Sequence, residues 1–231
     1  MHPDQLTSIT FFQKKKDITL YRASDASRDY ILKSIITKDT AIKQAFYDEY
    51  YILSSLSHPS VPKYYALVEE MLLPGQEKPS LVLCMEDCQK PSPGRLLSLA
   101  ELKEVMLSVF DVLRYLLEHG VLYTDLNPSN LIVFRQDEDW KIKLVDYTYC
   151  YYFLHNPRPA YSLRFSYNLS PALKGQQLLI QEMTLLFYEL MEQERISNPP
   201  SSLFRLLETG RTPSPHLDLD TFFQMLSHCS C

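Results

Sequence analysis

One short stretch of the chain carries an aspartate and an asparagine at a spacing that could serve chemistry. In GVLYTDLNPSNLIVF, Gly120 to Phe134, Asp125 and Asn130 stand five residues apart between two apolar runs. Short apolar runs predict strands, which places both polar side chains in the loop between them. Turns are rich in Asx and proline residues, so an ordinary loop is the alternative interpretation. The rest of the chain has to decide between a loop and a site.

Three further charged residues occupy positions where apolar side chains are expected. Lys33 lies in the apolar run DYILKSI, Glu49 lies on the apolar face of a predicted helix, and Asp146 follows the apolar run KIKLV. An unpaired charge in a core is costly, so Glu49 requires a cation, and Lys33 on the preceding strand is the natural one. Asn130 and Asp146 offer the hard oxygen ligands that Mg²⁺ prefers. Asp125 beside them could accept or orient a hydroxyl proton.

These residues must be positioned by two regions of different character. Alternating apolar patterns and turn residues predict the following elements in the first region: strands over 7–13, 18–24, 29–35, 63–70 and 80–86, and a helix over 38–57. A stretch rich in proline, glycine and serine follows and marks a boundary. In the second region, Ser98 and Glu101 form a capping box ahead of a helix that Gly120 ends. The remaining predicted elements are strands over 131–134 and 141–145 and helices over 174–193, 203–207 and 219–226.

Five segments resemble motifs of the protein kinase family, and they occur in the family's order. YTDLNPSN resembles the catalytic loop H-R-D-x-x-x-x-N, and VDYT resembles D-F-G. YILK resembles V-A-I-K, and DEYYILSSLSHPSVPKYY is similar to the helix that carries the partner glutamate of that lysine. LCMEDC is similar to the strand that leads into the hinge. Each motif alone is weak, but an accidental match to all five in order is much less probable.

The resemblance implies an α+β, bilobal protein-kinase-like fold that uses ATP and Mg²⁺. It divides the chain into a β-rich N-lobe with one helix over 1–86, a hinge region over 87–95, and an abbreviated, mainly helical C-lobe over 96–231. The resemblance implies that Asp125, Lys33 and Glu49 are catalytic, with Lys33 gripping the α- and β-phosphates. It implies that Met85 is the gatekeeper and that Glu86, Asp87 and Cys88 face adenine. Asn130 and Asp146 would bind Mg²⁺.

The chain also departs from the kinase pattern, which keeps a second hypothesis open. The chain has five glycines, and FFQKKKDI stands where the family has its glycine-rich phosphate loop; Lys14 to Lys16 could supply positive charge there or form a solvated turn. Thr148 replaces the D-F-G glycine, and Thr124 and Asn127 replace the catalytic-loop arginine and lysine. The first hypothesis is an ATP- and Mg²⁺-dependent kinase of Ser or Thr hydroxyls. The alternative is a pseudokinase that acts as a scaffold or allosteric partner, with or without nucleotide.

A third hypothesis is phosphorylation of a small molecule. The loop DLNPSN is similar to that of small bacterial effector kinases and of aminoglycoside-kinase relatives.

Composition limits the partners and the compartment. The net charge of −5 argues against nucleic acid as a partner, so ATP and a protein substrate or binding partner are expected. Five cysteines at scattered positions indicate no disulfide framework and favour a reducing, cytoplasmic setting; delivery as a secreted effector into a host cytosol is the alternative. Neither a signal peptide nor an apolar stretch of the roughly 18 residues that a membrane span needs is recognised, so a soluble protein is expected.

Overall fold

The computed structural model describes residues 6–15, 17–88, 96–148, 150–152, 171–214 and 216–229, with the backbone alone for 151–152 and 171–174. The chain divides into two compact units, Met1–Gln89 and Lys90–Cys231, and each is described by itself. Residues 89–95 of the predicted hinge region lie outside the described residues. The fold is α+β, with a β-rich first unit and a mainly helical second unit.

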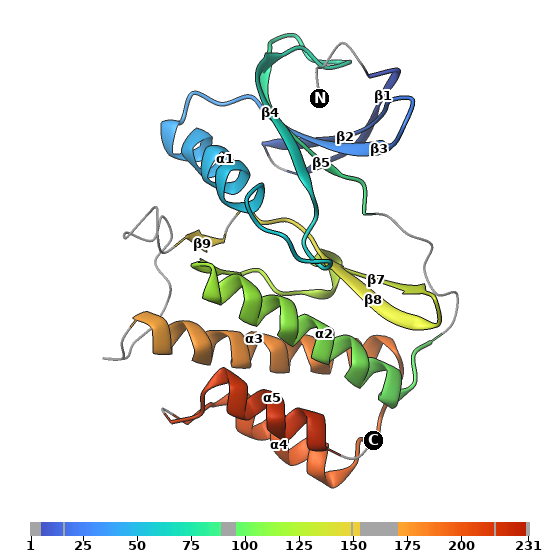
Figure 1. Ribbon diagram of the computed structural model, residues 1–231, viewed down its shortest axis with the longest axis vertical. Helices are drawn as coiled ribbons and strands as arrows, with labels where there is room; N and C mark the ends of the chain where they lie inside the picture. Colours follow the sequence, from blue (N-terminus) through green and yellow to red (C-terminus); the bar gives the residue numbers. More distant parts are fainter. Residues whose placement is uncertain are drawn as a thin grey trace. The chain divides into compact units, whose positions relative to one another are not determined.

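The first unit contains one antiparallel five-stranded sheet (Figure 1). Its strands are β1 (Ser8–Lys15), β2 (Ile18–Ser24), β3 (Asp29–Ile35), β4 (Tyr64–Met71) and β5 (Ser80–Glu86), in the spatial order β1-β2-β3-β5-β4. All five predicted strands are confirmed. Lys33 lies on the central strand β3, opposite Leu20 on β2 and Leu83 on β5. Because side chains alternate along a strand, Lys33 points away from the face on which its neighbour Leu32 joins the buried cluster around Tyr21 and Val82.

The helix α1 (Thr40–Leu53) packs against β4 and β5. Asp39 caps its start, because the Asp39 side chain accepts a hydrogen bond of 2.8 Å from the amide of Ala41. The predicted end of this helix, at residue 57, is wrong by one turn. After Leu53 the amides of Ser55 and Leu56 bond to carbonyls three residues back, at 3.1 and 3.2 Å, so the chain tightens into a turn before the proline is reached.

The strands β1 and β2 form a long antiparallel ladder. The two strands stay paired up to Lys15 and Ile18, with one bulge between Phe11 and Gln13. The described lysines of this segment, Lys14 and Lys15, are exposed on β1, and Lys16 lies outside the described residues. The β1–β2 ladder therefore continues, over the described residues, into the segment where the kinase resemblance would place a glycine-rich phosphate loop.

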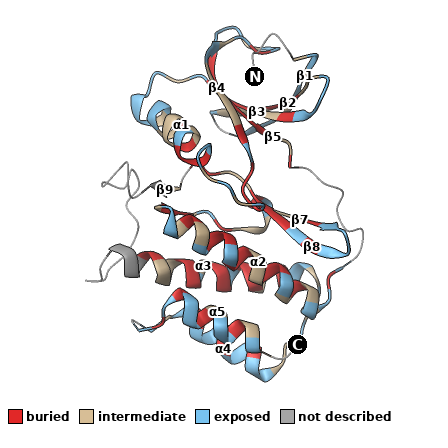
Figure 2. Ribbon diagram, viewed as in Figure 1, coloured by how far each residue is buried: buried red, intermediate tan, exposed pale blue. Residues whose placement is uncertain are grey.

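The second unit is built around the helices α2 (Leu99–Glu118) and α3 (Pro171–Gln193), followed by α4 (Ser201–Arg211) and α5 (Leu219–His228). The capping box of Ser98 and Glu101 is present, and the apolar stripe of α2 is buried (Figure 2). Helix α3 starts three residues before the predicted position 174, since a proline is well suited to the first turn of a helix. The last two helices extend beyond their predicted apolar cores. Among the described residues, no helix is both long and apolar enough to cross a membrane.

Short strands lie next to Asp125, Asn130 and Asp146 in the second unit. The strands β7 (Leu131–Gln136) and β8 (Asp139–Leu144) form the predicted hairpin, and both residues of its turn, Asp137 and Glu138, have positive φ, as such tight turns require. The 3-10 turn η2 (Pro128–Asn130) precedes β7. The strands β6 (Val121–Leu122) and β9 (Tyr151–Tyr152) pair with each other, although an irregular segment is what the sequence predicts around Tyr151.

Candidate active site

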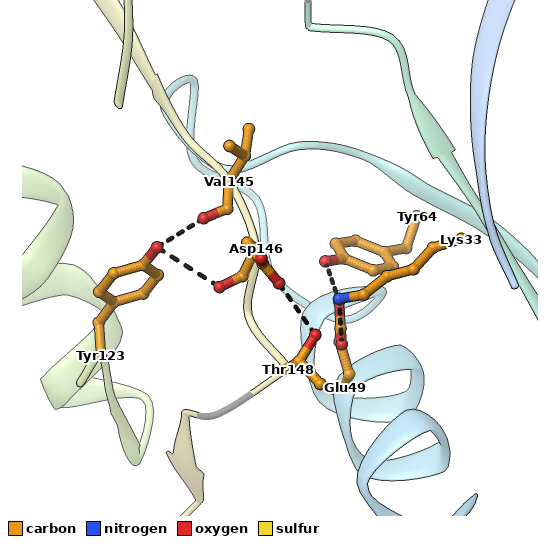
Figure 3. Close-up of polar contacts among 7 residues, drawn as sticks. All are labelled: Lys33, Glu49, Tyr64, Tyr123, Val145, Asp146 and Thr148. Carbon is orange, nitrogen blue, oxygen red and sulfur yellow. Dashed lines mark hydrogen bonds and ion pairs between the residues drawn. The ribbon is translucent and has the colours of Figure 1, made fainter. Parts of the chain in front are cut away.

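In the first unit, Lys33 and Glu49 form a buried ion pair (Figure 3). The ammonium of Lys33 donates to both carboxylate oxygens of Glu49, each at 2.9 Å. The phenol of Tyr64 on β4 donates to Glu49 Oε1 at 2.8 Å. Lys33 is 4% exposed and Glu49 is 0% exposed. The cation that Glu49 was predicted to require is therefore Lys33, and the carboxylate is satisfied by three donated bonds from two residues.

Glu49, and not the adjacent Asp48, is the buried carboxylate of α1. The adjacent Asp48 is partly exposed and accepts a bond of 2.8 Å from Gln44 on the same helix. The ring of Phe46, one turn before Glu49, is fully buried, and its centroid lies 5.6 Å from the Lys33 nitrogen. A cation over an aromatic face is favourable, so the apolar wall of this site also helps to hold the charge.

At the end of β5, the residues predicted to face a nucleotide base have structural contacts through their side chains. Met85 is buried. Glu86 pairs with Lys63 twice, because its amide donates to the Lys63 carbonyl at 2.8 Å and its carboxylate accepts from the Lys63 amide at 3.1 Å. The Asp87 carboxylate lies 3.3 Å from Arg22 Nε, and the buried thiol of Cys88 donates to the Glu86 carbonyl at 3.6 Å. Any base recognition by this segment would therefore use its main chain.

In the second unit, two amide side chains orient Asp125. The Asn130 amide nitrogen donates to Asp125 Oδ2 and to its carbonyl, both at 2.9 Å. The Asn127 amide nitrogen donates to the same carbonyl at 3.0 Å and to Oδ1 at 3.2 Å. Asn127 is itself held by the amide and hydroxyl of Ser129, at 3.0 and 2.6 Å. Asp125 is exposed and Asn130 is 3% exposed, so a buried amide aims an exposed carboxylate.

Asp146 is connected to the same loop through the β7–β8 hairpin. The Val145 amide donates to the Asn130 carbonyl at 2.9 Å. The phenol of Tyr123 donates to the carbonyls of Val145, at 2.5 Å, and Asp146, at 3.4 Å (Figure 3). The hydroxyl of Thr148 donates to Asp146 Oδ1 at 2.9 Å. These bonds connect the segments that carry the predicted residues Asp125, Asn130 and Asp146.

The comparison with known proteins decides the family. A family model described as Protein kinase domain matches residues 17–167, well over half of the chain. The chain belongs to the protein kinase family. It is 33% identical over 118 residues to the serine/threonine-protein kinase RUNKEL of Arabidopsis thaliana. That alignment covers 47% of this chain and 8% of the length of RUNKEL.

Within this kinase domain, the sequence did not reveal four contributors to the site. Tyr64 and Tyr123 are phenols whose partners lie on other elements, and Thr148 was seen only as a replacement for glycine. Burial raises the pKa of Tyr123 well above its ordinary value, with smaller contributions from nearby acidic groups, so this phenol stays protonated and remains a donor. The fourth contributor is Glu182 on α3. Its signal in the sequence was a charged residue next to Met183, which belongs to the buried stripe.

Glu182 is a partly buried carboxyl group in the electrostatic field of Asp125. Burial raises the pKa of Glu182, and the negative charges of Asp125 and Glu189 raise it further. A carboxyl whose pKa is higher in the folded chain than in the unfolded chain binds its proton more tightly when folded. Its contribution to stability is therefore complete below its ordinary pKa, about 4.3, and is lost as the pH rises through the folded value.

We expect Glu182→Gln to make the kinase domain more stable than the natural chain at pH 7. The amide carries no charge, so the cost of ionising a buried carboxyl beside Asp125 disappears. The difference in unfolding free energy between the two proteins should shrink as the pH falls towards 4, where Glu182 is protonated. Urea unfolding at several pH values measures this. Glu192→Gln, at an exposed position of the same helix, is the matched control and should show no such trend; equal trends in both variants would contradict the assignment.

Proposed function

We propose that the chain is an ATP- and Mg²⁺-dependent protein kinase that transfers a phosphoryl group to Ser or Thr hydroxyls of a protein. The observation that carries the proposal is the state of Asp125. Nucleotide binding alone would require Lys33, Asn130 and Asp146, whereas a carboxylate at position 125 serves proton transfer from the acceptor hydroxyl. This carboxylate is exposed and is oriented by the amides of Asn127 and Asn130. An exposed base with a fixed direction is what a hydroxyl acceptor needs.

The donor set of the second unit fits Mg²⁺. The side-chain nitrogen of Asn130 donates to Asp125, and the side-chain oxygen of Asn130 is the atom that could bind a metal ion. The Asp146 carboxylate accepts a bond from Thr148 at Oδ1, and an ionised carboxylate can accept bonds at both of its oxygens. Hard oxygens of this kind are the ligands that Mg²⁺ prefers. Bound there, the ion would neutralise phosphate charge.

The remaining residues take roles that follow from their contacts. Lys33 would grip the α- and β-phosphates of ATP as a point charge, and Glu49 holds its amine in place through the bonds described above. Asp125 would accept the proton of the attacking hydroxyl. For the base of ATP, the main chain around Met85 to Cys88 is the proposed contact, because the Glu86 and Asp87 side chains are engaged with Lys63 and Arg22.

The compartment proposed is the reducing cytoplasm. Among the described residues, Cys84, Cys88, Cys150 and Cys229 form no disulfide. Burial raises the pKa of the Cys84 thiol to about 12, so this cysteine is an inert core residue.

Phosphoryl transfer from labelled ATP to a panel of Ser- and Thr-containing proteins tests the proposed function. We expect Mg²⁺-dependent labelling by the natural chain, and about 10²-fold or more lower labelling by Asp146→Asn, because one charged metal ligand is lost. Asp139→Asn is the matched control, since this exposed aspartate belongs to the β7–β8 hairpin and pairs with Lys141 at 3.0 Å. Absence of any labelling that depends on Asp146 would overturn the proposal.

A pseudokinase is the second candidate, and the glycine-free segment between β1 and β2 favours it. Lys14 and Lys15, exposed at the end of β1, stand where the family has a loop whose glycine amides could cradle phosphates. The thermal shift with ATP and Mg²⁺ separates the candidates. Stabilisation without transfer to any acceptor would support a nucleotide-binding pseudokinase. No stabilisation at all would support a scaffold without nucleotide.

A further inference from the structure

Asp146 has a backbone conformation that L residues rarely adopt. Its φ is +64°, in the left-handed region where glycine is favoured. A residue other than glycine stays in this region only when its surroundings over-determine it, and such residues gather at functional sites. The contacts of the Asp146 main chain and side chain supply this constraint.

The main chain around Asp146 is held by buried aromatic residues. The phenol of Tyr123 donates to the carbonyls of both Val145 and Asp146. The rings of Tyr123 and Tyr147 are fully buried and meet edge to face, with centroids 5.2 Å apart. The Val145 amide is bonded to the carbonyl of Asn130. Both peptide groups that flank the α-carbon of Asp146 are thus connected to the loop that carries Asp125.

The carboxylate of Asp146 is held by a different group. Thr148 Oγ1 donates to Asp146 Oδ1 at 2.9 Å, and Thr148 is 7% exposed (Figure 3). Threonine is branched at Cβ and has few χ1 rotamers, so a buried threonine hydroxyl has few directions to point in. A hydrogen bond to an ionised acceptor is stronger than one between neutral groups. The hydroxyl therefore restricts the rotation of the carboxylate that the main chain has already placed.

We propose that Thr148 is a positioning residue for the metal ligand Asp146, which it holds in one orientation before any ligand binds. This inference rests on the proposed function in one respect, the assignment of Asp146 as a Mg²⁺ ligand. Where glycine would leave the segment after Asp146 adaptable, Thr148 supplies a donor two residues away. The Mg²⁺-binding half of the site is then set by the chain itself and does not have to be assembled by the nucleotide.

The test compares Thr148→Val with Thr148→Ser in the full chain. Valine keeps the branched shape and removes the donor, whereas serine keeps the donor. The first measurement is a Mg²⁺ titration at saturating ATP, followed by calorimetry. We expect the apparent Mg²⁺ affinity to fall about tenfold or more in Thr148→Val, as loss of a bond to a charged group implies, and to stay within about threefold of the natural value in Thr148→Ser.

The second measurement needs no ligand. Amide hydrogen exchange of Tyr147 and Thr148 is expected to be at least about tenfold faster in Thr148→Val and unchanged in Thr148→Ser. Thr148→Ala replaces the valine variant if that one does not fold. Faster exchange with unchanged Mg²⁺ affinity would overturn the inference, because the hydroxyl would then be structural only. Unchanged exchange would also overturn it.

A failure of the proposed function can be distinguished from a failure of the inference about Thr148. If the natural chain shows no Mg²⁺-dependent ATP binding, the proposed function is wrong, and the exchange measurement alone decides whether Thr148 holds Asp146. Faster exchange in the valine variant but not in the serine variant would then show that Thr148 holds Asp146 without serving a metal ligand, and the inference would be wrong on that point.

Discussion

Lys33→Met is expected to destabilise the chain by about 3–5 kcal/mol, because it leaves the fully buried carboxylate of Glu49 without its cation. Tyr64 alone would remain as a donor to that carboxylate. Glu49→Leu is also expected to destabilise the chain, since the buried Lys33 ammonium loses both of its bonds to Glu49. Urea unfolding measures both effects through the transition midpoint.

The double variant Lys33→Met/Glu49→Leu should recover most of that loss. With both charges removed, no ion is left buried, and apolar side chains of similar volume often replace a buried pair at little cost. The Tyr64 phenol would also lose the Glu49 carboxylate, to which it donates at 2.8 Å in the natural chain. Lys63→Met, at an exposed lysine of the same unit, is the control and should stay within about 0.5 kcal/mol. Single effects that simply add in the double variant would contradict the coupling.

Asp125→Asn is expected to lower kcat for phosphoryl transfer by about 10²–10⁴-fold. The amide cannot accept the proton of the attacking hydroxyl, whereas Lys33, Asn130 and Asp146, the residues proposed to bind ATP and Mg²⁺, are unchanged. The KM for ATP should therefore change little. Steady-state kinetics of the natural chain, the variant and the control Asp139→Asn measure this. A raised KM with unchanged kcat would show that Asp125 serves binding and not proton transfer.

The Asn substitution also has a structural cost, which has to be separated from the chemical one. Asp125 accepts bonds at both carboxylate oxygens, from Asn127 and Asn130, and an asparagine can offer an oxygen to one of these donors only. The unfolding free energy of Asp125→Asn should fall by about 1 kcal/mol. A loss of kcat that Asp125→Ala reproduces at equal or better stability would assign the kinetic effect to the missing carboxylate.

Most elements of the fold were predictable because their signals are local. The capping box at Ser98 and Glu101, the apolar stripe of α2 and the alternating strands each depend on residues a few positions apart. The pairing of Lys33 with Glu49 was also predictable, since two opposite charges on buried faces of consecutive elements have few other solutions. The end of α1 was not, because no proline or glycine marks it and the final turn simply tightens after Leu53.

The parts of the site that sequence reasoning missed depend on contacts between distant residues. Tyr64 meets Glu49 only because β4 packs beside α1, and Tyr123 reaches Val145 only after β7 and β8 have folded back. The two-residue strand β9 has no periodicity of its own, and its pairing with β6 is a tertiary effect. The role of Thr148 depends on the left-handed conformation of Asp146, which an aspartate does not announce in the sequence.

The pairing of β6 with β9 encloses the chain segment that carries Asp125 and Asp146. Val121 pairs with Tyr152 across this ladder, and the Asn130–Val145 main-chain bond closes a smaller ring inside it. Asp125 and Asp146 thus lie in one chain segment that is closed by the β6–β9 pairing and by the Asn130–Val145 hydrogen bond. These main-chain contacts restrict the distance between the two carboxylates. Large-scale motion elsewhere in the protein would move the two carboxylates together as one piece.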